Sequence, residues 1–149
     1  QVLWQIGKLY ADTYLDTPSA KLSHVKAILF IDRMDFAYAL ADVVIARAGA
    51  ITISELALTG KPVILVPSPY VTADHQTHNA KSLAKLGAAV LIKDGDAPQK
   101  AFPEALRMLE HPEELQKLEY EIMKLAKQNA ADDIADIIIQ LAQKINTST

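Results

Sequence analysis

The segment from Arg47 to Glu55 carries the residue types of an anion-binding turn. It follows the apolar run Val43-Val44-Ile45 and leads into further apolar residues, an order that predicts a strand, a tight turn at Gly49 and a short helix. The first amides of a helix have no partner within it, and the helix dipole is positive there. The start of this helix is therefore a candidate phosphate site. Arg47 could add its charge, although an arginine at a strand end is as often a structural ion-pair partner.

Glu55 lies one turn inside the same predicted helix and has two competing interpretations. Its carboxylate can accept hydrogen bonds from two ribose hydroxyls. Alternatively, Thr52 and Glu55 match a capping box, in which Thr52 is the N-cap and the Glu55 carboxylate accepts from the Thr52 amide. One carboxylate does not easily serve both purposes.

A second polar cluster, from Asp74 to Asn79, follows the next predicted strand. His75 and Asn79 are four residues apart and Gln76 and Asn79 three, so all three side chains can point the same way from a helix. Side-chain amides both donate and accept, which suits sugar hydroxyls. The alternative is a solvated first helical turn. The pair His75 and His78 has no thiol and no obvious third ligand with it, so we expect no metal site.

Alternating strand and helix patterns position the two clusters. Strands are predicted at Val2–Ile6, Val25–Ile31, Val43–Ala46, Val63–Val66 and Ala88–Ile92. Helices are predicted at Asp35–Ala41, at Thr52–Thr59 and from an N-cap at Asp74 to Leu86. This order is typical of an α/β fold with a Rossmann-like parallel sheet and flanking helices. Both polar clusters fall at the same end of consecutive strands, where such sheets bind ligands.

The remainder of the chain, residues 99–149, is predicted to be a helical tail of the same domain. Apolar stripes at helical spacing normally face the core. The predicted stripes are Phe36, Ala39 and Leu40 in the first helix, then Phe102, Leu106 and Leu109, then Leu115, Leu118, Ile122 and Leu125, and finally Ile134, Ile137, Ile138 and Leu141.

Composition excludes several classes of protein. The chain has 149 residues, half of them hydrophobic, which is enough for one domain with a real core. Its formal charge of −3 gives no reason to expect nucleic-acid binding and argues against a broad basic membrane patch. No cysteine is present, so disulfides and thiolate metal sites are excluded. No apolar run approaches the ~20 residues of a transmembrane helix.

Several motifs together resemble the carboxy-terminal donor domain of MurG-type N-acetylglucosaminyltransferases, which have the two-domain GT-B architecture. The matching segments are Phe30-Ile31-Asp32-Arg33-Met34, Asp42 through Glu55, Gly60-Lys61-Pro62, Val66-Pro67, and Asp74 through Ala80. The arginine–glycine–glutamate motif is shared in looser form by many GT-B enzymes. The Phe-Ile-Asp segment and the residues around Arg47 favour the MurG type.

The resemblance implies a role for each matching residue, with UDP-N-acetylglucosamine as the ligand and no cofactor. The backbone of Phe30 and Ile31 would read the uracil edge. Glu55 would hold the ribose hydroxyls. Ala50, Ile51 and Thr52 would contact the diphosphate, with Arg47 as a further candidate phosphate contact. The implied contacts with the N-acetylglucosamine are His75, Gln76 and Asn79. The family often has glutamine at the position of His75.

The resemblance also implies that parts of the parent enzyme lie outside this sequence. These are a first strand with a glycine-rich loop, and an amino-terminal domain with the catalytic base, the lipid-linked muramyl-pentapeptide site and the membrane contact. The parent would be cytoplasmic and peripheral on the inner face of the bacterial membrane, and the fragment alone inactive. Because the missing strand would lie centrally, we expect Val2–Ile6 and Val25–Ile31 to be separated from the other three strands, with unpaired edges.

Two other interpretations stay open at this point. The chain could be the donor domain of another GT-B transferase that acts on glycolipid or small-molecule acceptors. It could also be a non-catalytic or epimerase-type α/β domain that binds a nucleotide sugar.

Overall fold

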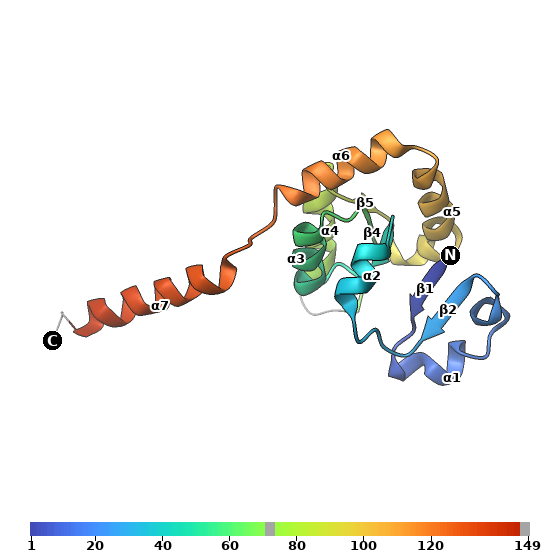
Figure 1. The fold of residues 1–149 in the computed structure, drawn as a ribbon, viewed down its shortest axis with the longest axis horizontal. Helices are drawn as coiled ribbons and strands as arrows, with labels where there is room; N and C mark the ends of the chain where they lie inside the picture. Colours follow the sequence, from blue (N-terminus) through green and yellow to red (C-terminus); the bar gives the residue numbers. More distant parts are fainter. Residues whose placement is uncertain (71–73, 147–149) are drawn as a thin grey trace. The chain divides into compact units, whose positions relative to one another are not determined.

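The computed structural model describes residues 1–70 and 74–146, which form two compact units, Gln1–Ala41 and Asp42 onward. Each unit has its own parallel sheet (Figure 1). The first sheet pairs β1 with β2, and the second has the order β3-β4-β5. The expected separation of the first two strands from the other three is therefore confirmed.

The first unit is built on β1 (Val2–Gln5) and β2 (Val25–Ile28), which pair in parallel with Val2 opposite Val25. The intervening segment contains three short helices: η1 (Lys8–Tyr10), α1 (Ala11–Tyr14) and η2 (Pro18–Lys21). Trp4 on β1 packs against Tyr14, with ring centroids 5.9 Å apart.

Helix α2 (Met34–Leu40) confirms the predicted helix but not its predicted inner face. Phe36 is 57% exposed and Leu40 83%, whereas Tyr38 is buried. The Arg33 guanidinium lies 3.9 Å from the centroid of the Phe36 ring, so this ring packs against a cation at the surface.

The second unit is organised around β4 (Val63–Leu65), between β3 (Val44–Ala46) and β5 (Val90–Leu91). Val44 is the register partner of Val63, and Ile64 that of Val90. All three residues of β4 are completely buried. A strand covered on both faces needs apolar residues at every position, which explains the continuous run in the sequence.

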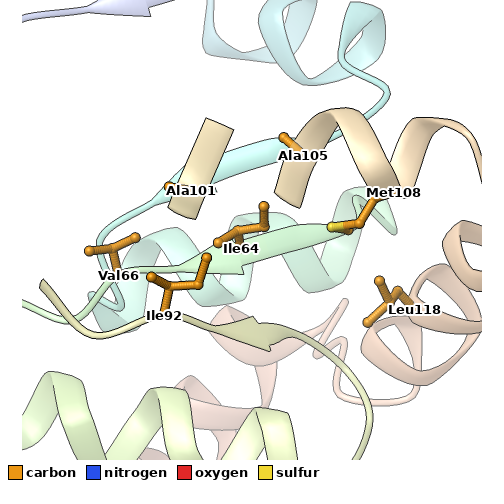
Figure 2. Packing of buried hydrophobic residues seen from close by; sticks show 7 residues of the cluster. All are labelled: Ile64, Val66, Ile92, Ala101, Ala105, Met108 and Leu118. Carbon is orange, nitrogen blue, oxygen red and sulfur yellow. The ribbon is translucent and has the colours of Figure 1, made fainter. Parts of the chain in front are cut away.

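Helices follow each strand of this sheet. They are α3 (Ala50–Thr59), α4 (His75–Lys85), η4 (Asp94–Asp96), α5 (Ala97–Leu109), α6 (Pro112–Met123) and α7 (Ala130–Asn146). Figure 2 shows a cluster of buried hydrophobic residues in which Ala101, Ala105 and Met108 of α5 lie over Ile64. Val66, Ile92 and Leu118 complete this cluster.

The face of α5 that packs on the sheet differs from the predicted one. Phe102, Leu106 and Leu109 are 44–49% exposed, whereas Ala101, Ala105 and Met108 are buried. The two alanines have small side chains, so the helix backbone can approach the sheet closely. In α6 the predicted face is confirmed at Leu118 and Ile122, which are buried, and at Leu115, which is half-buried; Leu125, also half-buried, lies beyond the end of the helix. The predicted stripe of α7 is more than half exposed at Ile134, Ile137, Ile138 and Leu141.

Arg107 links α5 to α6 through two carboxylates. Its Nη2 donates to Glu104 Oε1 at 2.8 Å, and its Nη1 donates to Glu114 Oε2 at 2.7 Å. The hydrogen bonds from Arg107 hold the pKa of both glutamates below the usual value. This network links α5 to α6, and both helices contribute side chains to the buried cluster around Ile64.

Candidate functional site

The turn between β3 and α3 presents three backbone amides at the carboxyl end of the sheet. Gly49 is the N-cap of α3, in an extended conformation with φ −71° and ψ 146°. The Ile53 amide donates the first helical hydrogen bond, to Gly49 O at 3.0 Å. The amides of Ala50, Ile51 and Thr52 precede that bond, so they are the donors that a helix cannot satisfy internally. The structure places all three residues in the first turn of α3, and their contact with a diphosphate stays a prediction.

The capping-box interpretation of Thr52 and Glu55 is wrong. The helix begins at Ala50, two residues earlier than predicted, so Thr52 lies inside it and Gly49 is the N-cap without a side-chain hydrogen bond. The extended backbone at Gly49 lets Ala50, a strong helix former, start the helix. Glu55, now in the second turn, is half-buried. Its assignment to the ribose hydroxyls stays a prediction.

Asn79 and Gln76 connect α4 to the ends of β3 and β4. Asn79 Nδ2 donates to Ala48 O at 3.1 Å, and Gln76 Oε1 accepts from the Ser68 amide at 2.9 Å. The structure therefore brings the two polar clusters together, as their positions after consecutive strands predicted. Each of these two hydrogen bonds uses one of the two polar atoms of the side-chain amide, Nδ2 in Asn79 and Oε1 in Gln76. The other atom, Nε2 of Gln76 or Oδ1 of Asn79, adds hydrogen-bonding capacity at the same place.

Helix α4 begins directly after Asp74, which has a left-handed backbone with φ 53°. The predicted N-cap position is thus confirmed, but the Asp74 side chain makes no capping hydrogen bond. Aspartate is among the few non-glycine residues that adopt this conformation readily. His75, the first residue of the helix, is exposed.

Arg47 forms an ion pair within the protein, which is the alternative to phosphate binding that the sequence analysis left open. Its Nη1 donates to Val66 O at 3.2 Å and forms an ion pair with Asp94 Oδ1. Asp94 was not among the candidates from sequence reasoning. Its position just beyond β5, at the carboxyl end of the third strand, is the signal that could have identified it.

An open cavity of about 250 Å³ lies beside Arg47. Its lining is mostly apolar and consists of Ile45, Ala46, Arg47, Val66, Ala97 and Ala101. This lining offers few groups that could bind a phosphate or a sugar, so we place the polar site at the α3 and α4 termini.

The proposed uracil-reading residues belong to the first unit. The Ile31 amide donates to the side-chain oxygen of Gln5, Oε1, at 2.8 Å. Phe30 is 61% exposed. The Gln5 oxygen is an acceptor of the same kind as a uracil carbonyl, and sequence reasoning did not identify Gln5. The role of Phe30 and Ile31 stays a prediction.

Two classes of feature are absent from the part of the chain that the structure describes. Residues 1–70 and 74–146 contain no group of three or more His, Cys, Asp or Glu side chains that could hold a metal ion. None of the helices in these ranges is both long and apolar enough to cross a membrane.

Residues 1–138 match the protein family described as Glycosyltransferase family 28 C-terminal domain. Two curated relatives carry the name UDP-N-acetylglucosamine–N-acetylmuramyl-(pentapeptide) pyrophosphoryl-undecaprenol N-acetylglucosamine transferase. The protein from Parabacteroides distasonis is 46% identical over 97% of this chain, which corresponds to 39% of that protein. The one from Porphyromonas gingivalis strain W83 is 47% identical over 95% of the chain and 38% of the relative. The chain thus spans less than half the length of these relatives.

Two solved structures have a similar fold. Acinetobacter baumannii MurG superposes with a TM-score of 0.76 at 32% identity, over 93% of this chain and 40% of that protein. The glycotransferase of kitacinnamycin superposes with a TM-score of 0.65 at 21% identity, over 90% of this chain and 34% of the other. At that identity the second likeness concerns the fold alone.

Proposed function

Because the chain belongs to the glycosyltransferase family 28 C-terminal domain family, we propose that it forms the UDP-N-acetylglucosamine-binding part of a transferase. The complete enzyme would transfer N-acetylglucosamine to the lipid-linked muramyl-pentapeptide precursor of peptidoglycan. The names of the two relatives support this substrate pair. We assign three further features to the part of such enzymes that this chain does not span. They are the acceptor site, the catalytic base and the contact with the inner face of the cell membrane.

The start of α3 is the observation that carries the proposal. The amides of Ala50, Ile51 and Thr52 point out of the helix at its positive end, where a diphosphate gains most from hydrogen bonds and the dipole. When the sugar leaves UDP, negative charge grows on the diphosphate oxygen that held it. Amides fixed in advance stabilise that charge without reorganisation, which lowers the barrier of transfer.

The neighbouring side chains are proposed to bind the rest of the donor. Glu55 accepts hydrogen bonds from the ribose hydroxyls. Gln76 and Asn79, together with His75, form hydrogen bonds with the hydroxyls of N-acetylglucosamine. Support comes from the bonds that tie Gln76 and Asn79 to the ends of β4 and β3, since these bonds hold the amides beside α3. Holding the donor in one orientation supplies the positional part of catalysis.

Replacing Glu55 by alanine tests the ribose assignment. In the complete gene product, Glu55→Ala is expected to weaken UDP-N-acetylglucosamine binding by about 1–3 kcal/mol, because two charge-assisted hydrogen bonds are lost. Isothermal titration calorimetry measures this change. The fold is expected to survive the change, because the N-cap position of α3 is Gly49 and not Thr52.

Ser54→Ala is the matched control on the same helix turn. Ser54 Oγ donates to Ala50 O at 3.0 Å within the helix, so its loss should leave donor affinity unchanged. Equal donor affinity of Glu55→Ala and wild type, together with a large drop in melting temperature, would assign Glu55 to structure and remove the ribose role.

Competition among nucleoside diphosphates tests the uracil assignment. UDP is expected to displace the donor at least about tenfold better than ADP or GDP, because a wrong base edge leaves a fixed backbone group unpaired. In this proposal the uracil carbonyl replaces Gln5 Oε1 as acceptor for the Ile31 amide. Competition titrations at fixed donor concentration measure the ratio, and equal displacement by the three diphosphates would refute this role of Phe30 and Ile31.

A further inference from the structure

One guanidinium joins the carboxyl ends of all three strands in the second sheet. Arg47 follows β3 directly, and its Nη1 donates to the carbonyl of Val66, the residue after β4, at 3.2 Å. The same nitrogen pairs with Asp94 in η4, which follows β5. Backbone bonds already connect these ends, from the Val66 amide to Ala46 O at 2.9 Å and from the Ile92 amide to Leu65 O at 3.0 Å. Arg47 therefore adds a side-chain link between the loops that follow the three strands, beyond the last backbone hydrogen bonds of the sheet.

The exposure of this pair argues against a role in overall stability. The side chain of Arg47 is 55% exposed and that of Asp94 31%, and ion pairs in such positions contribute little to the free energy of unfolding. A pair with little effect on stability can still fix the local geometry of the residues that carry it.

The neighbouring residue, Ala48, is held from another element. Ala48 is completely buried, and its carbonyl accepts from Asn79 Nδ2 at 3.1 Å. Gly49 follows and starts α3. The turn that presents the amides of α3 thus has two side-chain anchors, Asn79 on α4 and the Arg47–Asp94 pair. Without the second anchor, only Asn79 would hold the turn.

We propose that Asp94 is a positioning residue of the donor site, which acts through Arg47. Asp94 orients the guanidinium across the strand ends and thereby keeps the amides of Ala50, Ile51 and Thr52 in register for the diphosphate. This inference rests on the function proposed above. It differs from a direct role of Arg47 as phosphate ligand, because in that case Asp94 would compete with the phosphate for the same cation.

The sign of the effect of Asp94→Ala distinguishes these two roles. In the complete gene product, Asp94→Ala is expected to weaken UDP-N-acetylglucosamine binding roughly 3- to 30-fold, which lies within the range for residues coupled in one hydrogen-bond network. Asp94→Asn keeps an acceptor oxygen and should recover part of the loss. Arg47→Ala with Asp94→Ala should bind no more weakly than Arg47→Ala alone. Stronger binding by Asp94→Ala would overturn the proposal, since Asp94 would then be a competitor of the phosphate.

Asp96→Ala is the matched control in the same short helix. Asp96 pairs with Lys100 at 3.2 Å, an exposed pair within one segment, so its loss should leave donor binding unchanged. Hydrogen–deuterium exchange of residues 49–53 gives a readout without donor, and Asp94→Ala should exchange faster than Asp96→Ala there. Equal exchange and equal binding of these two variants would overturn this inference alone. A wild-type protein that binds no UDP-N-acetylglucosamine would instead overturn the proposed function.

Discussion

Ile64→Ala is expected to lower the free energy of unfolding of the second unit by about 2–5 kcal/mol. Ile64 is completely buried at the centre of β4, and the alanines and Met108 of α5 pack over it (Figure 2). Close-packed neighbours on a sheet relax only partly, so removing three carbon atoms leaves a cavity as well as a loss of buried apolar surface. Urea titration of the chain followed by circular dichroism measures the change.

Ile51→Ala makes the same side-chain deletion at a position that is 77% exposed. Without donor, this control is expected to change the free energy of unfolding by no more than about 0.5 kcal/mol. If both variants unfolded at the same urea concentration, β4 would not be the centre of the cooperative core, and the packing described here would be refuted.

Gly60→Ala is expected to destabilise the second unit by about 2–3 kcal/mol, from two separate causes. Gly60 ends α3 with a left-handed backbone at φ 64°, which disfavours any residue with a Cβ. An added Cβ would also lie 2.9 Å from Cγ and Sδ of Met123, so the methionine must move. Because Met123 is 57% exposed, it can turn outward, which limits the second cost.

Gly87 separates the two causes, since it has φ 70° but no heavy atom within 4 Å of an added Cβ. Gly87→Ala should therefore cost only the backbone part, about 1–2 kcal/mol. In a Met123→Ala background, Gly60→Ala should fall to the same cost. Thermal unfolding of the four variants measures both parts, and an equal cost of Gly60→Ala with and without Met123 would exclude the contact.

Local patterns predicted the elements of the second unit better than their faces. The strand predicted at Val63–Val66 and the helix end predicted at Thr59 depend on signals within a few residues, and the structure has β4 at Val63–Leu65 and the end of α3 at Thr59. Helix α5 carries apolar residues on two faces. The sequence analysis predicted that the face with the large side chains, Phe102, Leu106 and Leu109, would be buried. The sheet instead accepts Ala101 and Ala105, since only small side chains allow the close approach of this helix. That preference depends on the partner surface, which local spacing does not encode.

In the candidate site, too, local patterns predicted the elements better than the individual side-chain contacts. A helix after Gly49 and the polar cluster of α4 were predicted from their places after consecutive strands, although α3 begins two residues earlier than expected. The Thr52–Glu55 spacing matched a capping box, but Gly49 occupies the N-cap position and Thr52 lies inside the helix. The partner of Arg47 lies 47 residues further along the chain, beyond the reach of any local motif. Only the rule that parallel strands end at one edge could have indicated Asp94.

The run Val63–Val66, buried in the folded unit, is exposed on the nascent chain until its cover has been synthesised. Part of that cover, Leu118, follows about 50 residues later, a delay of roughly 3–10 s at ribosomal speed. Short uncharged segments of β-branched residues are the typical seeds of cross-β aggregation. Pro62 and Pro67 enclose this run on both sides, and neither can donate a hydrogen bond to a strand of another copy. The prolines thus remove a backbone donor at each end of the run, which limits the length over which a strand of another copy could pair with it.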